Sequence, residues 1–222
     1  MEIAVKSEVR PYTPCDRPLI ETIAYRTGFL GESSEAFWRH RKSWAAIWIA
    51  PYLDGEPEST FVATVDGDVV GYLTGCVDTE QFKGPDAVMM HNVMRYWLLY
   101  RPGVAGFMWR AMLDQVCNGC RGHKTTGGEL HDPRWPSHLH MNLMPEVRGR
   151  GLGGALIEAW FERLKTVGSP GCHLSVVQEN RRALGFFSAM GFEPHGAPMP
   201  IPGMRGHRGE RLHQQMMVRS VT

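Results

Sequence analysis

The chain has 222 residues, of which 43% are hydrophobic and 21% are charged, and its formal net charge is +1. This length suits one core, so we expect a single domain spanning residues 1–222. The near-zero charge excludes nucleic acid and anionic membranes as partners attracted by a global charge. No apolar run approaches the roughly 20 residues of a membrane span, and the N-terminal MEIAVKSEVR lacks a signal-peptide core, so we expect a cytoplasmic protein.

The first quarter of the chain predicts a strand and two helices. SEVRPYT (7–13) has the composition of a strand, and DRPLIETIAYRTGF (16–29) has helical spacing with Asp16 as N-cap. The next segment, 33–53, also has helical spacing, and Pro51 is expected to end that helix.

A hairpin is predicted over 59–77, where two β-branched runs flank Asp66-Gly67. Such a pair suits the positive φ angles of a type I′ turn. The following segment, 79–133, is less regular and is expected to be an insert. Apolar residues recur at helical spacing around 86–99 and 104–116, and we expect these helical stripes to pack against a core.

The strand predicted at HLHMNLM (138–144) separates two kinds of side chain. Because successive side chains of a strand point to opposite faces, three apolar residues share one face and three polar residues share the other. The apolar set is Leu139, Met141 and Leu143, and the polar set is His138, His140 and Asn142.

The remaining pattern is a helix at 151–167, a strand at 172–177 and a short helix that Asn180 caps. FEPHG and RLHQQMMVRS then predict two closing strands. The order of elements indicates an α+β fold: a mixed central sheet, flanked by helices, with a locally parallel strand–helix–strand unit.

Five cysteines are present, and reduced thiols are expected. Cys117 and Cys120, with His123 and His131 downstream, could be the ligands of a zinc site. Structural zinc sites usually show a second well-spaced pair of ligands, which these histidines do not provide. We therefore predict no metal.

The run PEVRGRGLGG (145–154) joins the strand at 138–144 to the helix at 151–167. A helix start carries free N–H groups and partial positive charge, and glycines let a backbone approach a phosphate closely. Arg148 and Arg150 add cationic charge. The sequence thus predicts a phosphate or pyrophosphate site.

Three ligand classes fit such a turn. Residues 149–154 match the dinucleotide fingerprint G-x-G-x-x-G, but four residues separate strand and first glycine, and too little chain follows for a Rossmann sheet. A P-loop needs Gly-Lys-Ser/Thr, which is absent. The third class rests on motifs at a fixed separation. The run 148–153 matches R/Q-x-x-G-x-G/A, and a helix and a strand later come Asn180-Arg-Arg-Ala-Leu-Gly-Phe-Phe187 and Gly191-Phe192.

These motifs resemble those of the GNAT superfamily of acetyl-CoA-dependent N-acetyltransferases over about 138–193. A second pattern, IWIAPYLDGEPESTFVATVDGDVVGYLTGCVDT together with 136–193, resembles the acetyltransferase-like C-terminal domain of protein O-GlcNAcases and its bacterial stand-alone relatives. The resemblance implies the GNAT fold, acetyl-CoA (coenzyme A) as cofactor, and transfer of acetyl to an amine.

The resemblance also implies a set of cofactor contacts. Backbone N–H groups of the turn would hold the pyrophosphate, the end of the preceding strand would pair with the pantetheine amides, and Asn180 with Phe186 would lie along the arm. The implied cofactor-binding residues are Leu143, Met144, Arg148, Gly149, Arg150, Gly151, Leu152, Gly153, Gly154, Asn180 and Phe186.

Candidate catalytic residues lie on the polar face of the strand 138–144. His138 or His140 could take the proton of the attacking amine, since imidazoles titrate near neutral pH. Asn142 could orient the substrate. The tyrosine that usually protonates the thiolate is replaced by Phe187, so Tyr72, Tyr96, Tyr100 or water would have to substitute.

The predicted function is thus acetyl transfer from acetyl-CoA to an amine of a protein, peptide or small molecule, with the insert 79–133 shaping the acceptor groove. Phe187 leaves a second interpretation open, in which the chain is a catalytically inactive CoA-binding or peptide-binding module. A monomer or a homodimer is expected.

Overall fold

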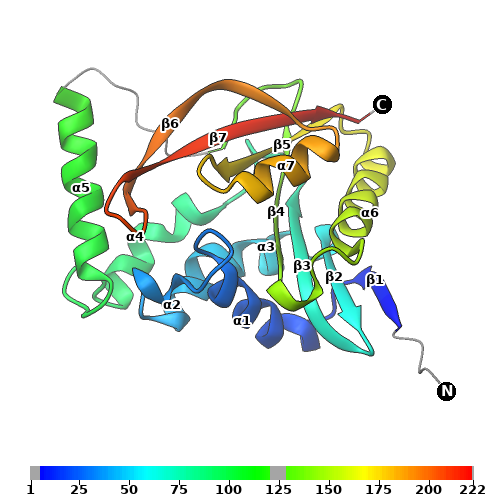
Figure 1. Cartoon of the computed structure of the whole chain (residues 1–222), viewed down its shortest axis with the longest axis horizontal. Helices are drawn as coiled ribbons and strands as arrows, with labels where there is room; N and C mark the ends of the chain where they lie inside the picture. Colours follow the sequence, from blue (N-terminus) through cyan, green and yellow to red (C-terminus); the bar gives the residue numbers. More distant parts are fainter. Residues whose placement is uncertain (1–5, 121–128, 222) are drawn as a thin grey trace.

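The computed structural model describes residues 6–120 and 129–221. Seven strands form one sheet in the order β1-β2-β3-β4-β5-β7-β6 (Figure 1). All neighbours are antiparallel except β4 and β5, which are parallel. The strands are β1 Ser7–Pro11, β2 Thr60–Val65, β3 Asp68–Cys76, β4 Ser137–Leu143, β5 Gly171–Val177, β6 Glu193–Arg205 and β7 Arg211–Ser220.

The helices cover both faces of the sheet. They are α1 Arg17–Thr27, α2 Arg41–Trp48, α3 Ala50–Gly55, α4 Pro85–Arg95, α5 Ala105–Cys120, α6 Leu152–Val167 and α7 Arg181–Ala189. This mixed sheet with flanking helices confirms the predicted fold class. No helix among the described residues is long and apolar enough to cross a membrane.

Alternation along the strands places one core on each face of the sheet. On one face Leu73 and Leu139 pack against α6, whose Trp160 is fully buried. On the other face Val62 and Tyr72 pack against α1. The two faces of β4 therefore differ as predicted, with its apolar side chains turned toward α6.

The predicted hairpin is confirmed. β2 and β3 meet at Asp66 and Gly67, whose φ angles are 51° and 92°. Both angles are positive, as a type I′ turn requires. The Asp66 side chain also accepts a hydrogen bond from the backbone N–H of Lys6.

Two predicted boundaries are wrong. The single helix expected over 33–53 is interrupted, and Pro51 stands in the first turn of α3 instead of ending a helix. A first helical turn tolerates proline because its N–H groups have no partner there. β6 extends to Arg205, well beyond the FEPHG motif. Its several prolines are tolerated because β6 is an edge strand.

The insert carries helices where they were expected, but only part of it joins a core. Val93, Leu98 and Val104 pack with Trp38 and Trp44 in a third cluster beside α2. In α5, Phe107 and Met108 also contact this cluster, whereas Trp109, Met112, Leu113 and Val116 face outward. Cys117 and Cys120 lie exposed on α5, and His123 lies outside the described residues.

Candidate functional site

The parallel pair at the centre of the sheet separates after two residues. β4 and β5 pair only at Ser137 with Cys172 and at His138 with His173, whereas β4 stays paired with β3 as far as Leu143. Beyond His138, the edge of β4 that faces β5 therefore has no partner strand among the described residues. Unpaired N–H and C=O groups on such an edge can bind an extended ligand backbone.

The glycine turn follows directly at the end of this open edge. Gly149 and Gly151 have φ angles of 81° and 80°, and no atom lies within 4 Å of a Cβ built at either position. Glycine is therefore required at both positions by the positive φ angle, and not by a lack of room for a side chain. Gly151 is the N-cap of α6 and offers no side-chain cap. The first N–H groups of α6 thus lack helical partners, as an anion site needs.

A close contact fixes the floor of the turn. A Cβ at Gly153 would lie 3.0 Å from the Phe186 ring and 3.3 Å from Leu143 Cδ1. This contact brings the start of α6 against both α7 and the end of β4. A larger residue would push the turn away from them, so the cradle depends on glycine at this position.

Arg148 is turned inward instead of toward the turn. Its guanidinium donates to the carbonyls of Gly31 (3.1 Å) and Leu143 (3.2 Å), and its backbone N–H donates to Pro145 O at 3.3 Å. The backbone N–H of Arg148, which the sequence predicts to bind an anion, therefore already donates to a carbonyl of the protein itself. Burial and the nearby Arg182 lower the pKa of Arg148. Arg150 remains exposed at the mouth of the turn.

Asn180 and Met144 hold the elements on either side of the open edge. The Asn180 side chain accepts a hydrogen bond from Ala183 N at 3.2 Å, which gives α7 the predicted cap. The N–H of Met144 donates to Val70 O at 2.9 Å, so this residue stays tied to β3. Their contacts with a cofactor stay predictions.

His138 is buried under the polar face of β4. It is 1% exposed, and its Nε2 lies 3.0 Å from the hydroxyl of Tyr52 while Nδ1 lies 2.8 Å from Thr79 Oγ1. Burial lowers the pKa of His138 to about 3, so the imidazole is neutral at physiological pH. With both nitrogens engaged, His138 is better placed to support the site than to meet a substrate.

Glu129 is the residue of this site that sequence patterns did not indicate. Its carboxylate lies 3.4 Å from His140 Nε2 and 3.2 Å from His173 Nε2. Burial alone would raise the pKa of Glu129, but His140 and His173, with His138 nearby, outweigh it and hold the pKa well below its ordinary value. The carboxylate is therefore ionised beside the imidazole of His140.

His140 combines access with this acidic neighbour. Its side chain is 39% exposed, in contrast to the buried His138 and His173, and its ring meets Tyr52 edge-on at 5.2 Å. It lies two residues past His138, where β4 has just left β5. Of the two predicted bases, His140 is the one whose side chain is accessible to a ligand.

The same cluster has the composition of a metal site. Ligand atoms of Glu129, His138 and His173 lie within 4.8 Å of one another. The ring nitrogens of His173 are nevertheless engaged by Trp135 O (2.8 Å) and Leu130 N (3.1 Å), and those of His138 by side chains already named. This network engages both imidazoles, whereas Glu129 Oε2 is buried without a hydrogen-bond partner among the described residues; the absence of a metal stays a prediction.

The remaining predicted groups lie near the site or away from it. Asn142 donates through Nδ2 to the hydroxyl of Thr27 in α1, which fixes its side chain. Phe187 is 8% exposed and packs against Phe186, so no hydroxyl occupies the usual position of the acid. Burial raises the pKa of Tyr72 far above its ordinary value. Tyr96 and Tyr100 belong to the insert.

The stability of the fold should decrease as the pH is lowered, because of His138. Its pKa of about 3 in the folded state lies below the roughly 6.5 of an unfolded histidine. As the pH falls, the unfolded chain takes up a proton first. The contribution is therefore complete above about pH 6.5 and is lost toward pH 3, at up to about 1.4 kcal/mol per pH unit. Urea unfolding between about pH 7 and pH 5, where carboxylates stay ionised, measures the slope.

The matched variant for this measurement is His138→Gln, which cannot titrate. It should be less stable at neutral pH, since a buried pair of hydrogen bonds is disturbed, but its stability should depend less on pH. An equal slope in both proteins would contradict the assignment to His138.

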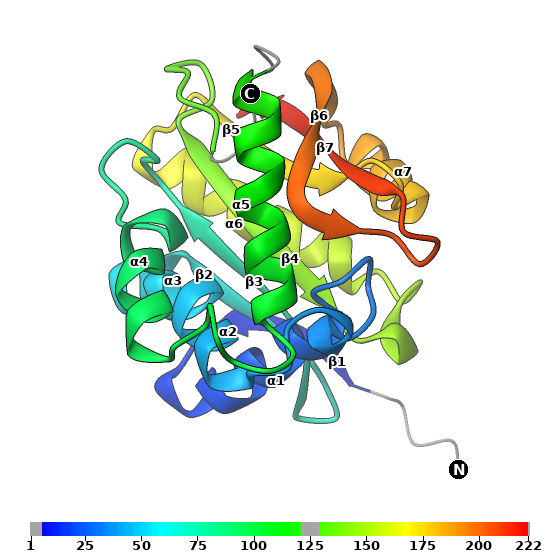
Figure 2. The same ribbon diagram turned by 90° about the vertical axis from the view of Figure 1, so that its left-hand side faces the viewer.

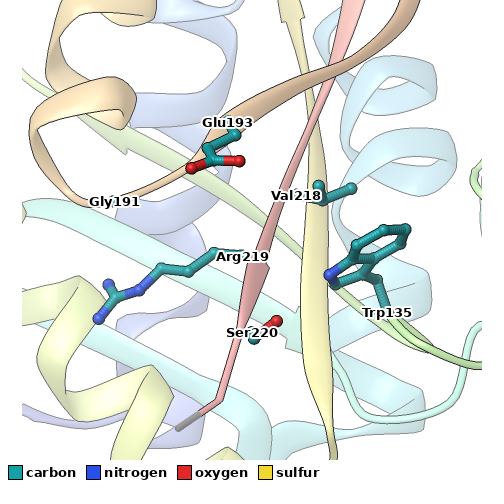
Figure 3. A pocket seen from close by; sticks show the side chains of 6 residues that line it. All are labelled: Trp135, Gly191, Glu193, Val218, Arg219 and Ser220. Atoms are coloured by element: carbon teal, nitrogen blue, oxygen red, sulfur yellow. The ribbon is translucent and has the colours of Figure 1, made fainter.

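A separate cavity of about 320 Å³ lies at the other end of the central strands from the turn (Figure 3). Trp135, Gly191, Glu193, Val218, Arg219 and Ser220 line it. Arg219 extends across the opening toward α6 and stacks on Phe161, 3.9 Å from the ring centroid. This cavity is remote from the open edge of β4, and we assign it no role.

Comparison with known proteins shows which family and which solved structures this chain is similar to. The model described as "Acetyltransferase (GNAT) family" matches residues 25–192. The structure of SsHAT is 26% identical, covers 98% of this chain and 99% of that chain, and has a TM-score of 0.65. Two others share the fold at lower identity. A Drosophila melanogaster polyamine N-acetyltransferase is 16% identical, with 97% and 100% coverage and a TM-score of 0.59. The Salmonella typhimurium protein yncA, solved with acetyl-CoA, is 13% identical, with 97% and 94% coverage and a TM-score of 0.57.

Proposed function

Because the chain belongs to the Acetyltransferase (GNAT) family, we propose that it binds acetyl-CoA and transfers the acetyl group to an amine nitrogen. The observation that carries this proposal is the open edge of β4, which leads from the histidine cluster to the glycine turn at the start of α6. A long ligand with amides in its middle and phosphates at one end matches both parts. The yncA structure, which shares the fold, holds this cofactor.

The turn and the strand would divide the ligand between them. N–H groups from Gly149 to Gly154 would bind the pyrophosphate, and exposed Arg150 would add charge. The free edge up to Leu143 would pair with the pantetheine amides, as one strand pairs with another. The thioester would then lie near the point where β4 leaves β5, beside His140.

His140 is the base that this arrangement favours. A protonated amine cannot attack a thioester, so a group must hold the proton that nitrogen loses. The imidazole of His140 is 39% exposed, and the Glu129 carboxylate lies 3.4 Å from its Nε2. Glu129 would orient the ring and stabilise the imidazolium, while Asn142 and buried His138 hold the neighbouring face in place.

The reaction needs no further cofactor. The amine nitrogen forms a bond with the acetyl carbon, the carbon–sulfur bond breaks, and His140 holds the proton released by the amine. Backbone N–H groups of the open edge can stabilise the charge that develops on the thioester oxygen. Since Phe187 supplies no hydroxyl, the thiolate would leave unassisted or take a proton from water, which its thiol-like pKa permits.

The function is tested by calorimetric titration with acetyl-CoA, followed by release of free thiol from acetyl-CoA in the presence of amines. The amine panel should span lysine peptides, protein N-termini and small polyamines. Failure to bind acetyl-CoA would contradict the proposal. Binding without turnover on any amine would favour the inactive CoA-binding module, for which buried Phe187 is the supporting observation. The resemblance to the O-GlcNAcase-associated domains stays a prediction, and so does the single domain over 1–222.

A further inference from the structure

The later part of helix α5 has its amphipathic character reversed, although Phe107 and Met108 near its start pack against the core. The side chains of Asp114 and Asn118 are buried against the rest of the protein, whereas Trp109, Leu113 and Val116 are 47%, 63% and 65% exposed. These three apolar residues follow one another at i, i+4 and i+7, so they form one continuous stripe. A helix at a protein surface normally buries that stripe and exposes its polar face.

Polar contacts hold α5 in this orientation. Asp114 accepts hydrogen bonds from the N–H of Gly203 and from Arg205, both at 2.8 Å, and pairs with Arg211 at 3.2 Å. The hydrogen bond from Arg205 is the largest cause of a lowered pKa at Asp114, so the carboxylate is charged. A Cβ at Gly203 would lie 2.8 Å from that of Ala111, so the helix rests directly on the backbone of β6. The helix cannot turn its apolar stripe inward without breaking these contacts.

Helix α4 and the segment after it extend the same apolar face. Met90, Met94 and Trp97 again follow at i, i+4 and i+7, with exposures of 66%, 64% and 70%. Trp109 Nε1 donates to Leu99 O at 3.0 Å, which joins α5 to this segment. Trp97 has a φ of 53°, an unfavourable angle for a bulky residue, so backbone strain accompanies its exposed position.

Figure 2 shows α5 upright at the centre of the face toward the viewer, with α4 lower and to its left on the same face. We call this the α4–α5 apolar surface. It consists of Met90, Met94, Trp97, Tyr100, Trp109, Met112, Leu113 and Val116, which are 45% to 72% exposed.

The size of the surface matches one side of a stable interface. Trp97, Tyr100 and Trp109 are aromatic, at roughly 150–250 Å² each, and with their exposures and those of the five aliphatic residues the surface exposes on the order of 800 Å². This exceeds the ~300–600 Å² that is typical of the largest apolar patch on a monomer. It equals the ~800 Å² that each partner contributes to a standard protein interface.

The charge of the α4–α5 apolar surface indicates which kind of partner it can bind. Between residues 105 and 120 the charged side chains are Arg110 and Asp114, and Asp114 is buried and paired on the opposite side of α5. Arg95 and Arg110 are exposed beside these residues, but the eight side chains of the surface itself carry no charge, so its contact with a second copy is mainly apolar. We propose that this chain forms a two-fold symmetric homodimer through the α4–α5 apolar surface.

The spacing along α5 suits this symmetry. Trp109, Met112, Val116 and Gly119 alternate three and four positions apart, as the seam residues of paired helices do. A Cβ at Gly119 would meet nothing within 4 Å, so a second helix can approach closely at that end. Two copies of α5 crossing antiparallel about a two-fold axis bury both stripes, and the Met and Trp residues of α4 flank them.

The test is the mass of the full chain in solution, measured by light scattering after size exclusion and by sedimentation at micromolar concentrations. The wild-type protein should have about twice the 25.0 kDa mass of one chain. The double variant Leu113→Glu/Val116→Glu should be monomeric with unchanged circular dichroism, since both positions are exposed. Leu19→Glu and Val167→Glu are the matched controls, because these exposed apolar residues lie outside the surface, and both should remain dimeric.

Two outcomes would overturn the proposal. One is a wild-type protein that stays monomeric over the whole concentration range. The other is a Leu113→Glu/Val116→Glu variant that keeps the wild-type mass, which would move the interface elsewhere. Acetyl-CoA binding serves as an independent check of folding, and it should be equal in the variant and the wild-type protein because the turn lies outside the surface.

Discussion

Gly151→Asp removes acetyl-CoA binding and leaves the fold largely intact: this is the expected result with the largest effect. The residue is the N-cap of α6 and has a φ of 80°. An aspartate there is strained by about 1–2 kcal/mol in the left-handed region. Its carboxylate would also lie where we propose that the pyrophosphate binds, and would repel it. We expect the affinity to fall by at least about 100-fold, which corresponds to about 2.7 kcal/mol.

Two further variants separate strain from charge. Gly151→Ala imposes the strain without the carboxylate and should weaken binding less than the aspartate does. Gly67→Asp places the same substitution at a φ of 92° in the hairpin, where a Cβ also meets no atom within 4 Å. It should lower stability by a similar amount and leave the acetyl-CoA affinity unchanged. Wild-type affinity in Gly151→Asp would show that the anion site lies elsewhere.

His140→Gln should remove most of the catalysis and little of the cofactor affinity. General-base catalysis contributes about 10²–10⁴-fold, so kcat with a saturating amine should fall by that range. The acetyl-CoA Kd should stay within about 3-fold, because the turn and the strand edge are unchanged. Rates at high pH should recover in part, since a larger fraction of the free amine is then already deprotonated.

Glu129→Gln tests whether Glu129 positions His140 for catalysis or has no part in it. If its carboxylate acts through His140, the loss in Glu129→Gln and the loss in His140→Gln should not add in the double variant. His91→Gln, an exposed histidine on α4, is the matched control and should keep the wild-type kcat. Full activity in His140→Gln would exclude this residue as the base.

Features coded by neighbouring residues could be predicted from the sequence. Asp66-Gly67 fixes its hairpin, Asn180 caps its helix, and Gly149 and Gly151 carry the left-handed angles of the turn. In each case the cause lies within a few residues of the effect. The alternation along β4 likewise separates its apolar face from its polar face, because a strand has a period of two.

Features that depend on distant contacts could not be predicted. Glu129 joins the site through His140 and His173, which lie on two different strands, and nothing in its own neighbourhood marks it. The expectation that apolar stripes of the insert pack inward holds for Val93 in α4 and for Phe107 and Met108 near the start of α5, and is wrong for the later part of α5. There the arginines of β6 and β7 bind Asp114 and decide which side of the helix faces the protein.

The separation of β4 from β5 has a mechanical consequence. The sheet consists of two ribbons, β1 to β4 and β5 to β7, and backbone pairing joins them at only two residue pairs, at Ser137 and His138. A ligand bound along the open edge of β4 would link the two ribbons. While the ligand is bound, the two ribbons would move together. After the ligand dissociates, each ribbon could move independently of the other.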